Sequence, residues 1–173
     1  MTDALARAES LIDLTPDYPS SGILFRDISP LLADADALRT VCEALAAPFE
    51  GEFDIVGGIE ARGFLLAGYV AAMTGVGMLP IRKAGKLPKP AAAASYDLEY
   101  GSATIEAPDV LREGERVLLL DDVLATGGTL AAAQRLVTDL GAVVAGSAVV
   151  LELADLADRS RVTAPVHSVF SAE

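Results

Sequence analysis

The chain has 173 residues and a formal net charge of −12, because 13 Lys and Arg stand against 25 Asp and Glu. A chain of this length buries about 70% of the surface that it exposes when unfolded, so one domain over residues 1–173 is expected. With 52% hydrophobic and 22% charged residues, the composition excludes an intrinsically disordered chain. The acidic balance argues against a nucleic-acid partner, whose phosphates favour a basic surface.

Cysteine content and the N-terminal sequence both bear on the compartment. Cys42 is the single cysteine and cannot form an internal disulfide, which favours a reducing environment. The first residues lack the basic flank and apolar run of a secretory signal, so a cytoplasmic location is expected. Residues 64–81 carry no charge, but Gly75, Gly77 and Pro80 interrupt their second half. A buried helix followed by a buried strand is therefore predicted there, and no membrane contact.

The expected elements begin with an amphipathic helix over residues 4–14, capped by Thr2 or Asp3. Residues 15–30 contain several Pro and Gly residues around a short apolar segment, and this composition predicts an ordered loop. A second helix is predicted near residues 36–49, with apolar side chains on one face.

From residue 53 onward, short apolar runs alternate with helical stretches, a pattern that indicates βαβ units and a parallel sheet. The predicted strands are residues 54–59, 77–82, 116–120, 143–152 and 166–170, with crossover helices at 63–74 and 129–140. The interval 83–107 interrupts this pattern with a basic segment and a hairpin-like alternation, and such excursions are usually functional. The predicted fold is α/β, with a mainly parallel central sheet flanked by helices and a flexible hairpin flap.

The strongest local signal is the run VLLLDDVLATGGT at residues 117–129. A buried strand leads to two carboxylates and then to a loop of small residues that opens a helix, at the sheet edge where ligands bind in α/β folds. The backbone N–H groups of such a loop and the positive end of the helix form a receptor for a phosphate dianion. Each piece alone also occurs in ordinary turns, but their order favours phosphate binding. The predicted ribose-phosphate residues are Asp121, Asp122, Ala125, Thr126, Gly127, Gly128 and Thr129.

This run resembles the phosphoribosyl pyrophosphate motif of the type I phosphoribosyltransferases, and four further blocks are similar to the adenine branch of that family. The blocks are PDYP and GILFRDISP within residues 16–30, GIEARGF at 58–64, IRKAGKLP at 81–88 and SYDLEYG at 95–101. The resemblance runs nearly end to end. It implies the type I fold, a homodimer, and a role in purine salvage in which a phosphoribosyl group moves from phosphoribosyl pyrophosphate to N9 of adenine, giving AMP and pyrophosphate with Mg²⁺ required.

Pyrophosphate binding is expected at a second strand-to-helix turn and at a basic segment. A cation at the start of a helix is disfavoured by the helix dipole, so an anionic partner for Arg62 is expected. The predicted pyrophosphate-binding residues are Glu60, Ala61, Arg62, Arg82, Lys83 and Lys86. Mg²⁺ is expected to be bound mainly through oxygen atoms of the substrate, and no protein ligand to the metal is predicted.

The resemblance also implies roles for the flap and for the base site. Glu99, together with Arg62, is the expected catalytic residue, with Glu99 as the acid/base group, and Tyr100 closes over the site. A solvent-exposed hairpin carboxylate is the alternative for Glu99. The adenine-binding residues are expected to be Leu24, Phe25, Arg26 and Leu153, although core packing explains Phe25 and Leu153 equally well.

Two other functions remain open at this point. One is a phosphoribosyltransferase for another nucleobase, and the other is a regulator that senses phosphoribosyl pyrophosphate without catalysis. A regulator of that kind would need a partner-binding region, and the first 50 residues contain no basic recognition helix.

Overall fold

The structure is a computed structural model of the chain, and it describes every residue except 1, 19, 99, 100 and 173. The predicted functional residues Glu99 and Tyr100 lie outside the described residues. Two compact units follow one another along the chain, residues 1–44 and 45–173.

Short elements make up the first unit. They are α1 (Asp3–Glu9), β1 (Asp13–Pro16), β2 (Leu24–Asp27), α2 (Ser29–Ala33) and α3 (Ala35–Ala46), whose last residues belong to the second unit. Thr2 caps α1 as predicted, since its side-chain oxygen accepts a hydrogen bond from the backbone N–H of Leu5 at 3.3 Å. The first helix ends at Glu9, earlier than predicted, because the chain is already extended at Asp13.

Residues 15–30 are not the loop that their composition predicts. β1 and β2 pair as an antiparallel hairpin. Asp17 has a positive φ of 59° in the connecting turn, and its carboxylate accepts a hydrogen bond from the N–H of Gly22 at 2.7 Å. The rings of Tyr18 and Phe25 meet edge to face with their centroids 5.2 Å apart. The prediction of a loop was wrong because a turn and an aromatic contact form these strands, and neither produces apolar alternation along the sequence.

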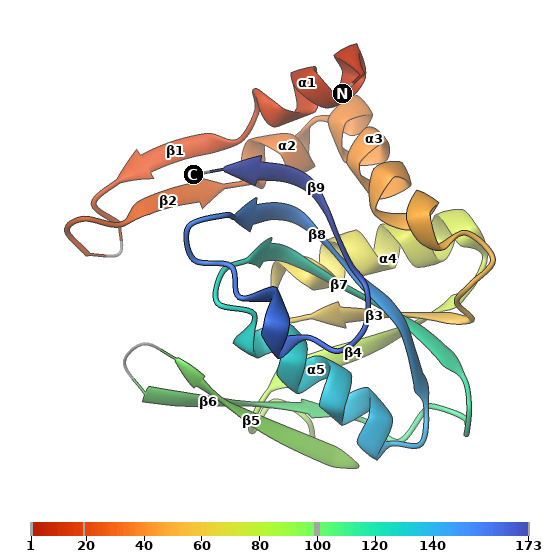
Figure 1. Cartoon of the computed structure of the whole chain (residues 1–173). Helices are drawn as coiled ribbons and strands as arrows, with labels where there is room; N and C mark the ends of the chain where they lie inside the picture. Colours follow the sequence, from red (N-terminus) through yellow and green to blue (C-terminus); the bar gives the residue numbers. More distant parts are fainter. Residues whose placement is uncertain (1, 19, 99–100, 173) are drawn as a thin grey trace. The chain divides into compact units, whose positions relative to one another are not determined.

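The second unit is built on a seven-stranded sheet in the order β5-β6-β4-β3-β7-β8-β9 (Figure 1). The strands are β3 (Ile55–Ile59), β4 (Gly77–Lys83), β5 (Ala92–Leu98), β6 (Gly101–Ala107), β7 (Arg116–Leu124), β8 (Val143–Leu153) and β9 (Val166–Ala172). β4, β3, β7, β8 and β9 pair in parallel, whereas β6 pairs antiparallel with both β4 and β5. The predicted fold class and the hairpin in the 83–107 excursion are confirmed.

Two crossover helices connect the parallel strands. α4 (Arg62–Thr74) leads from β3 to β4, and α5 (Gly128–Asp139) leads from β7 to β8. From the central strands β3 and β7, the chain moves to β4 on one side of the sheet and to β8 on the other. Because both crossovers are right-handed, α4 and α5 cover opposite faces of the sheet (Figure 1). The short 3₁₀ helices η1 (Ala47–Phe49) and η2 (Arg159–Arg161) complete the unit. No helix in the described part of the chain combines the length and apolarity of a membrane span.

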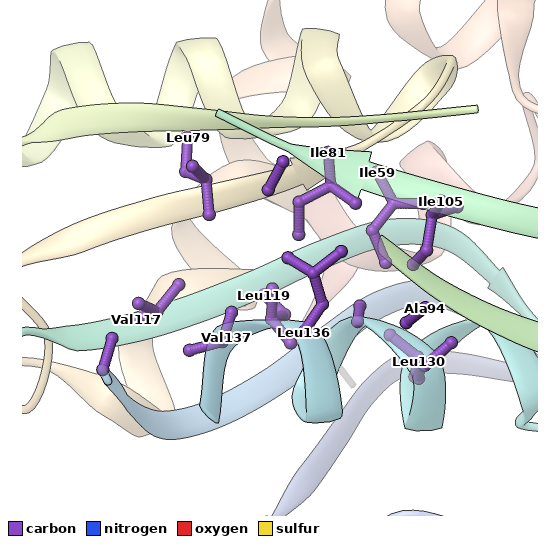
Figure 2. Packing of buried hydrophobic residues seen from close by; sticks show 14 of the residues in the cluster. Ile59, Leu79, Ile81, Ala94, Ile105, Val117, Leu119, Leu130, Leu136 and Val137 are labelled. Atoms are coloured by element: carbon purple, nitrogen blue, oxygen red, sulfur yellow. The ribbon is translucent and has the colours of Figure 1, made fainter. Parts of the chain in front are cut away.

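The core between α5 and the sheet fixes the strands that carry the site. Figure 2 shows Leu130, Leu136 and Val137 of α5 pointing toward the side chains of the sheet, among them Leu119 of β7. The packing is close enough that a Cβ on Gly57 of β3 would lie 2.8 Å from the Leu119 side chain. Burial of each large side chain here contributes about 1.5–3 kcal/mol. The centre of the sheet is therefore a rigid base for the loops at its edge.

A buried hydrogen-bond network ties α5 to β8 and to the segment before β9. Gln134 of α5 is 2% exposed, and its Nε2 donates to the hydroxyl of Ser147 at 3.0 Å. Its Oε1 accepts hydrogen bonds from the backbone N–H groups of Thr163 and Ala164 and from the Thr163 hydroxyl, at 2.9 to 3.2 Å. One buried side chain thus bonds the buried Ser147 hydroxyl and three polar groups of the segment before β9 at once.

Replacing Gln134 with Leu is expected to lower the free energy of unfolding by about 1–3 kcal/mol, because it leaves the donors on residues 163 and 164 without their acceptor. Urea denaturation measures this change. The matched control is Ser95→Ala, which removes an exposed hydroxyl pair with Thr104 and should cost less than about 0.5 kcal/mol. Equal losses for the two variants would contradict the account of this network.

Candidate active site

The site begins with the parallel pairing of β3 and β7 at the centre of the sheet. Ile55 lies opposite Val117 and Gly58 lies opposite Leu120, so the carboxyl ends of the two strands reach the same edge. β3 continues into α4 and β7 continues into α5. Since the two helices leave toward opposite faces, this edge is the switch point of the sheet, where ligands bind in open α/β folds.

The loop after β7 enters α5 through a left-handed turn, and its role in phosphate binding stays a prediction. Gly127 has a φ of +78° and precedes the first residue of α5. A Cβ there would lie 2.8 Å from the backbone oxygen of Asp158, so both the conformation and the space require glycine. The N–H groups in the first turn of a helix have no acceptor within the helix, which suits them to an anion. Residues 125–129 therefore form one continuous turn at the positive end of α5.

The two carboxylates lie within β7 and not beyond its end. The strand was predicted to end at Leu120, but it continues to Leu124 because β8 pairs with it over this stretch. Asp121 is therefore only 8% exposed. Burial raises the pKa of Asp121, and the neighbouring carboxylate of Asp122 raises it further. The Asp121 side chain also accepts a hydrogen bond from the Asp122 N–H at 2.9 Å.

An ion pair joins the two predicted anion subsites. Arg62, the first residue of α4, donates from Nη1 to Oδ2 of Asp122 at 2.7 Å, with the side chains 34% and 17% exposed. An anionic partner for Arg62 was expected from the sequence, because the helix dipole disfavours a cation at the start of a helix. The carboxylate of Asp122 is one such partner. α4 approaches β7 closely at this point, since a Cβ on Gly63 would lie 2.6 Å from the backbone oxygen of Leu120.

Glu60 braces the basic segment at the end of β4. Its Oε2 accepts a hydrogen bond from the N–H of Lys83 at 3.0 Å and lies 3.4 Å from Nε of Arg82. The N–H of Lys83 and the charge of Arg82 lower the pKa of Glu60. Arg82 in turn donates to the backbone oxygen of Lys86 at 3.1 Å. Within the described part of the chain, the ammonium groups of Lys83 and Lys86 make no hydrogen bond or ion pair.

The contacts of Glu60 with Lys83 and Arg82 were not predicted from the sequence. The role of Glu60 in pyrophosphate binding stays a prediction. The peptide bond between Glu60 and Ala61 is cis. Ala61 precedes α4 and lies in the same strand-to-helix turn as Arg62.

The predicted base-binding residues are divided between the units. Leu24, Phe25 and Arg26 lie on β2 of the first unit, and Leu153 ends β8 in the second. Phe25 and Leu153 are both half-buried, and Phe25 has the Tyr18 ring at its edge. Their roles in adenine binding stay predictions.

Sequence reasoning also missed the ion pair between Glu152 of β8 and Arg159 of η2. Both residues lie in a region without a recognisable motif, and the contact depends on how the loop after β8 turns back. No sequence signal indicated it.

Comparison with known proteins agrees with this fold. Residues 31–173 match the family model described as "Phosphoribosyl transferase domain". This match covers most of the chain, including both strand-to-helix turns at the switch point. It defines the class of protein, one that transfers a phosphoribosyl group.

The relatives give the branch within that class. The adenine phosphoribosyltransferase of Renibacterium salmoninarum is 55% identical over 152 residues, which are 87% of this chain and 84% of the relative. That of Clavibacter sepedonicus is 54% identical over 172 residues, 98% of this chain and 90% of the relative. The crystal structure of adenine phosphoribosyltransferase from Rhodothermus marinus has a TM-score of 0.92 at 45% identity and 98% coverage of both chains. The chain belongs to the adenine phosphoribosyltransferases of the phosphoribosyltransferase family, as the sequence blocks indicated.

The buried Asp121 carboxyl predicts an unusual dependence of stability on pH. Its pKa is higher in the folded chain than the value of about 3.9 in an unfolded chain, so folding is opposed increasingly as pH rises above about 4. Asp121→Asn removes this opposition and should raise the free energy of unfolding at pH 7, with the gain shrinking as the pH falls toward 4. Urea denaturation across this range measures it. Equal free energies of unfolding for the variant and the wild type are expected near pH 4, and a loss for Asp121→Asn at pH 7 would contradict the prediction.

Proposed function

We propose that the chain catalyses transfer of the phosphoribosyl group of phosphoribosyl pyrophosphate to N9 of adenine, with Arg62 and Asp122 at the centre of the donor site. The observation that carries the proposal is that two strand-to-helix turns lie at the same edge of the sheet, where the ion pair between these residues links the start of α4 to β7. Such a pair of anion-binding turns suits a donor with a phosphate at one end of its ribose and a diphosphate at the other. The relatives named adenine phosphoribosyltransferase support adenine as the base.

The 5′-phosphate of the donor occupies the loop of residues 125–129 in this proposal. The support is the left-handed turn at Gly127 and the start of α5 directly after it. Backbone N–H groups bind the phosphate oxygens, and the hydroxyls of Thr126 and Thr129 add donors. The positive end of α5 contributes to the attraction.

The ribose and diphosphate lie between Asp122 and the basic groups. Asp122 accepts hydrogen bonds from the ribose hydroxyls, with the buried Asp121 holding its backbone N–H. Arg62 turns from Asp122 to the diphosphate or is shared between the two. Lys83 and Lys86 supply further positive charge on the loop that Glu60 braces. The substrate is the Mg²⁺ complex of the donor, in which the donor's own oxygen atoms bind most of the metal's coordination sites.

The reaction breaks the bond between C1′ of the ribose and the diphosphate oxygen and forms a bond between C1′ and N9 of adenine. Positive charge develops on the ribose while negative charge grows on the departing pyrophosphate, so placed charges and Mg²⁺ supply most of the stabilisation. N9 loses its proton as it attacks. We assign that proton to Glu99, with Tyr100 closing the flap and excluding water.

Leu24, Phe25, Arg26 and Leu153 are the residues to which we assign adenine recognition. The support is the similarity of the GILFRDISP block to the adenine branch and the structures of relatives. The Saccharomyces cerevisiae enzyme, 35% identical with a TM-score of 0.92 over 98% of this chain, was crystallised with adenine and an imino-altritol bisphosphate. We further propose a cytoplasmic homodimer.

The proposed activity predicts that the chain releases pyrophosphate from phosphoribosyl pyrophosphate and Mg²⁺ when adenine is the acceptor, and not with guanine or hypoxanthine. A coupled pyrophosphate assay with each base offered separately measures this. Glu99→Gln should lower kcat with adenine by about 10²-fold or more, with little change in KM, because it removes the proton acceptor.

Each other outcome of this assay contradicts a defined part of the proposal. Release of pyrophosphate with guanine or hypoxanthine would support the donor site but contradict adenine as the specific base. Donor binding without release under any base indicates a regulator. Unchanged kcat in Glu99→Gln removes that residue from the proton transfer.

A further inference from the structure

The loop after β8 is fastened to the sheet by an arginine–carboxylate pair that no predicted function uses. Arg159 of η2 donates from Nε to Oε1 of Glu152 at 2.8 Å and from Nη2 to Oε2, so the contact is bidentate. The hydroxyl of Ser168 on β9 donates to the same carboxylate at 2.7 Å, and Nη1 of Arg159 donates to the backbone oxygen of Val166 at 2.9 Å. We call Glu152 and Arg159 the clasp.

The clasp is more strongly held than most surface ion pairs. The Glu152 side chain is 13% exposed and Arg159 is 48% exposed. Arg159 and Ser168 lower the pKa of Glu152 to about 2, so the carboxylate is charged at neutral pH. A planar guanidinium with two bonds to one carboxylate fixes direction as well as distance.

The segment held by the clasp touches the phosphate loop. Asp158 directly precedes η2, and its backbone oxygen lies 2.8 Å from the point where a Cβ of Gly127 would be. The side chain of Arg161, at the other end of η2, lies 3.7 Å from the same point. η2 thus lies against the left-handed turn that precedes α5 and leaves no space for a side chain at Gly127.

The same loop also fixes the end of β8. The backbone oxygen of Leu153 accepts hydrogen bonds from the N–H groups of Leu156 and Ala157 at 3.0 and 2.8 Å. Glu152 itself lies opposite Leu124, the residue before the phosphate loop. The clasp therefore connects three parts of the second unit: the end of β8, the end of β7 and the turn at Gly127.

We propose that Glu152 and Arg159 are positioning residues for the donor, and that their clasp holds η2 against Gly127 so that the loop of residues 125–129 keeps its phosphate-binding shape. Neither side chain needs to touch the substrate. The inference rests on the proposed function in so far as it assigns the 5′-phosphate to this loop. Loss of the clasp allows η2 to withdraw, and the turn at Gly127 then samples other conformations before the phosphate binds.

The test compares the affinity for ribose 5-phosphate and the steady-state constants of the wild type and Arg159→Ala. Calorimetric affinity for ribose 5-phosphate should fall about tenfold or more, and KM for phosphoribosyl pyrophosphate should rise similarly while kcat changes less, because misplacement of a binding loop acts on binding first. Arg159→Lys should recover only part of the affinity, since an ammonium cannot form the bidentate contact.

The chain offers a matched control in Arg116, which makes the same kind of bidentate pair with Asp54 at the start of β7. That pair lies at the opposite end of the strand from Asp121 and Asp122. Arg116→Ala should lower thermal stability about as much as Arg159→Ala but leave ribose 5-phosphate affinity unchanged. If Arg159→Ala does not fold, Glu152→Gln and Arg159→Lys provide the same comparison.

Wild-type affinity for ribose 5-phosphate in the clasp variants, or an equal loss in Arg116→Ala, would overturn the inference. These outcomes differ from failure of the proposed function. A wild-type chain that binds ribose 5-phosphate but forms no AMP contradicts the activity, while the comparison of affinities still decides the role of the clasp. A wild-type chain that forms AMP but does not bind ribose 5-phosphate keeps the proposed activity, and the change in KM for phosphoribosyl pyrophosphate in Arg159→Ala then decides the role of the clasp.

Discussion

The parallel pairing of β3 with β7 determines where every other part of the second unit's site lies. Each strand leads into a helix, and the two helices cover opposite faces, so both helix N-termini remain at the same edge of the sheet. The positive ends of two helices then face one region, which favours anions. The Arg62–Asp122 pair, at 2.7 Å, links the start of α4 to β7 at this edge. Close backbone contacts at Gly57 and Gly63 keep the strands and α4 at these distances.

A local group of positive charges, Arg82, Lys83 and Lys86, stands in a chain whose net charge is negative. The chain carries a net charge of −12, yet the proposed donor carries several negative charges. The basic segment at the end of β4 resolves this conflict, because Glu60 and Glu106 accept hydrogen bonds from its backbone N–H groups at Lys83 and Gly85. The lysine ammonium groups are thereby displayed by a braced loop, and a focused patch of this kind attracts an anion despite the acidic total. Burial raises the pKa of the Asp121 carboxyl.

Most of the second unit could be predicted from sequence because its signals are local. Apolar runs gave the parallel strands, and the order of strand, carboxylates and small residues gave the loop of residues 125–129. The hairpin of β1 and β2 was missed because an Asp turn and an aromatic contact form it. The extension of β7 through Asp121 was missed because it depends on pairing with β8. The pairing of Glu152 with Arg159 and the buried hydrogen bonds of Gln134 depend on tertiary contacts, which no periodicity records.

The most direct test of the account is to locate the phosphate of the donor. Backbone amide resonances of the uniformly labelled chain can be followed by NMR while ribose 5-phosphate is added. The account predicts that the largest shifts fall on the N–H groups of Thr126 to Thr129, since these lie in the turn and the first residues of α5. Shifts confined to the basic segment of Lys83 to Lys86, with the amides of residues 126–129 unchanged, would contradict it.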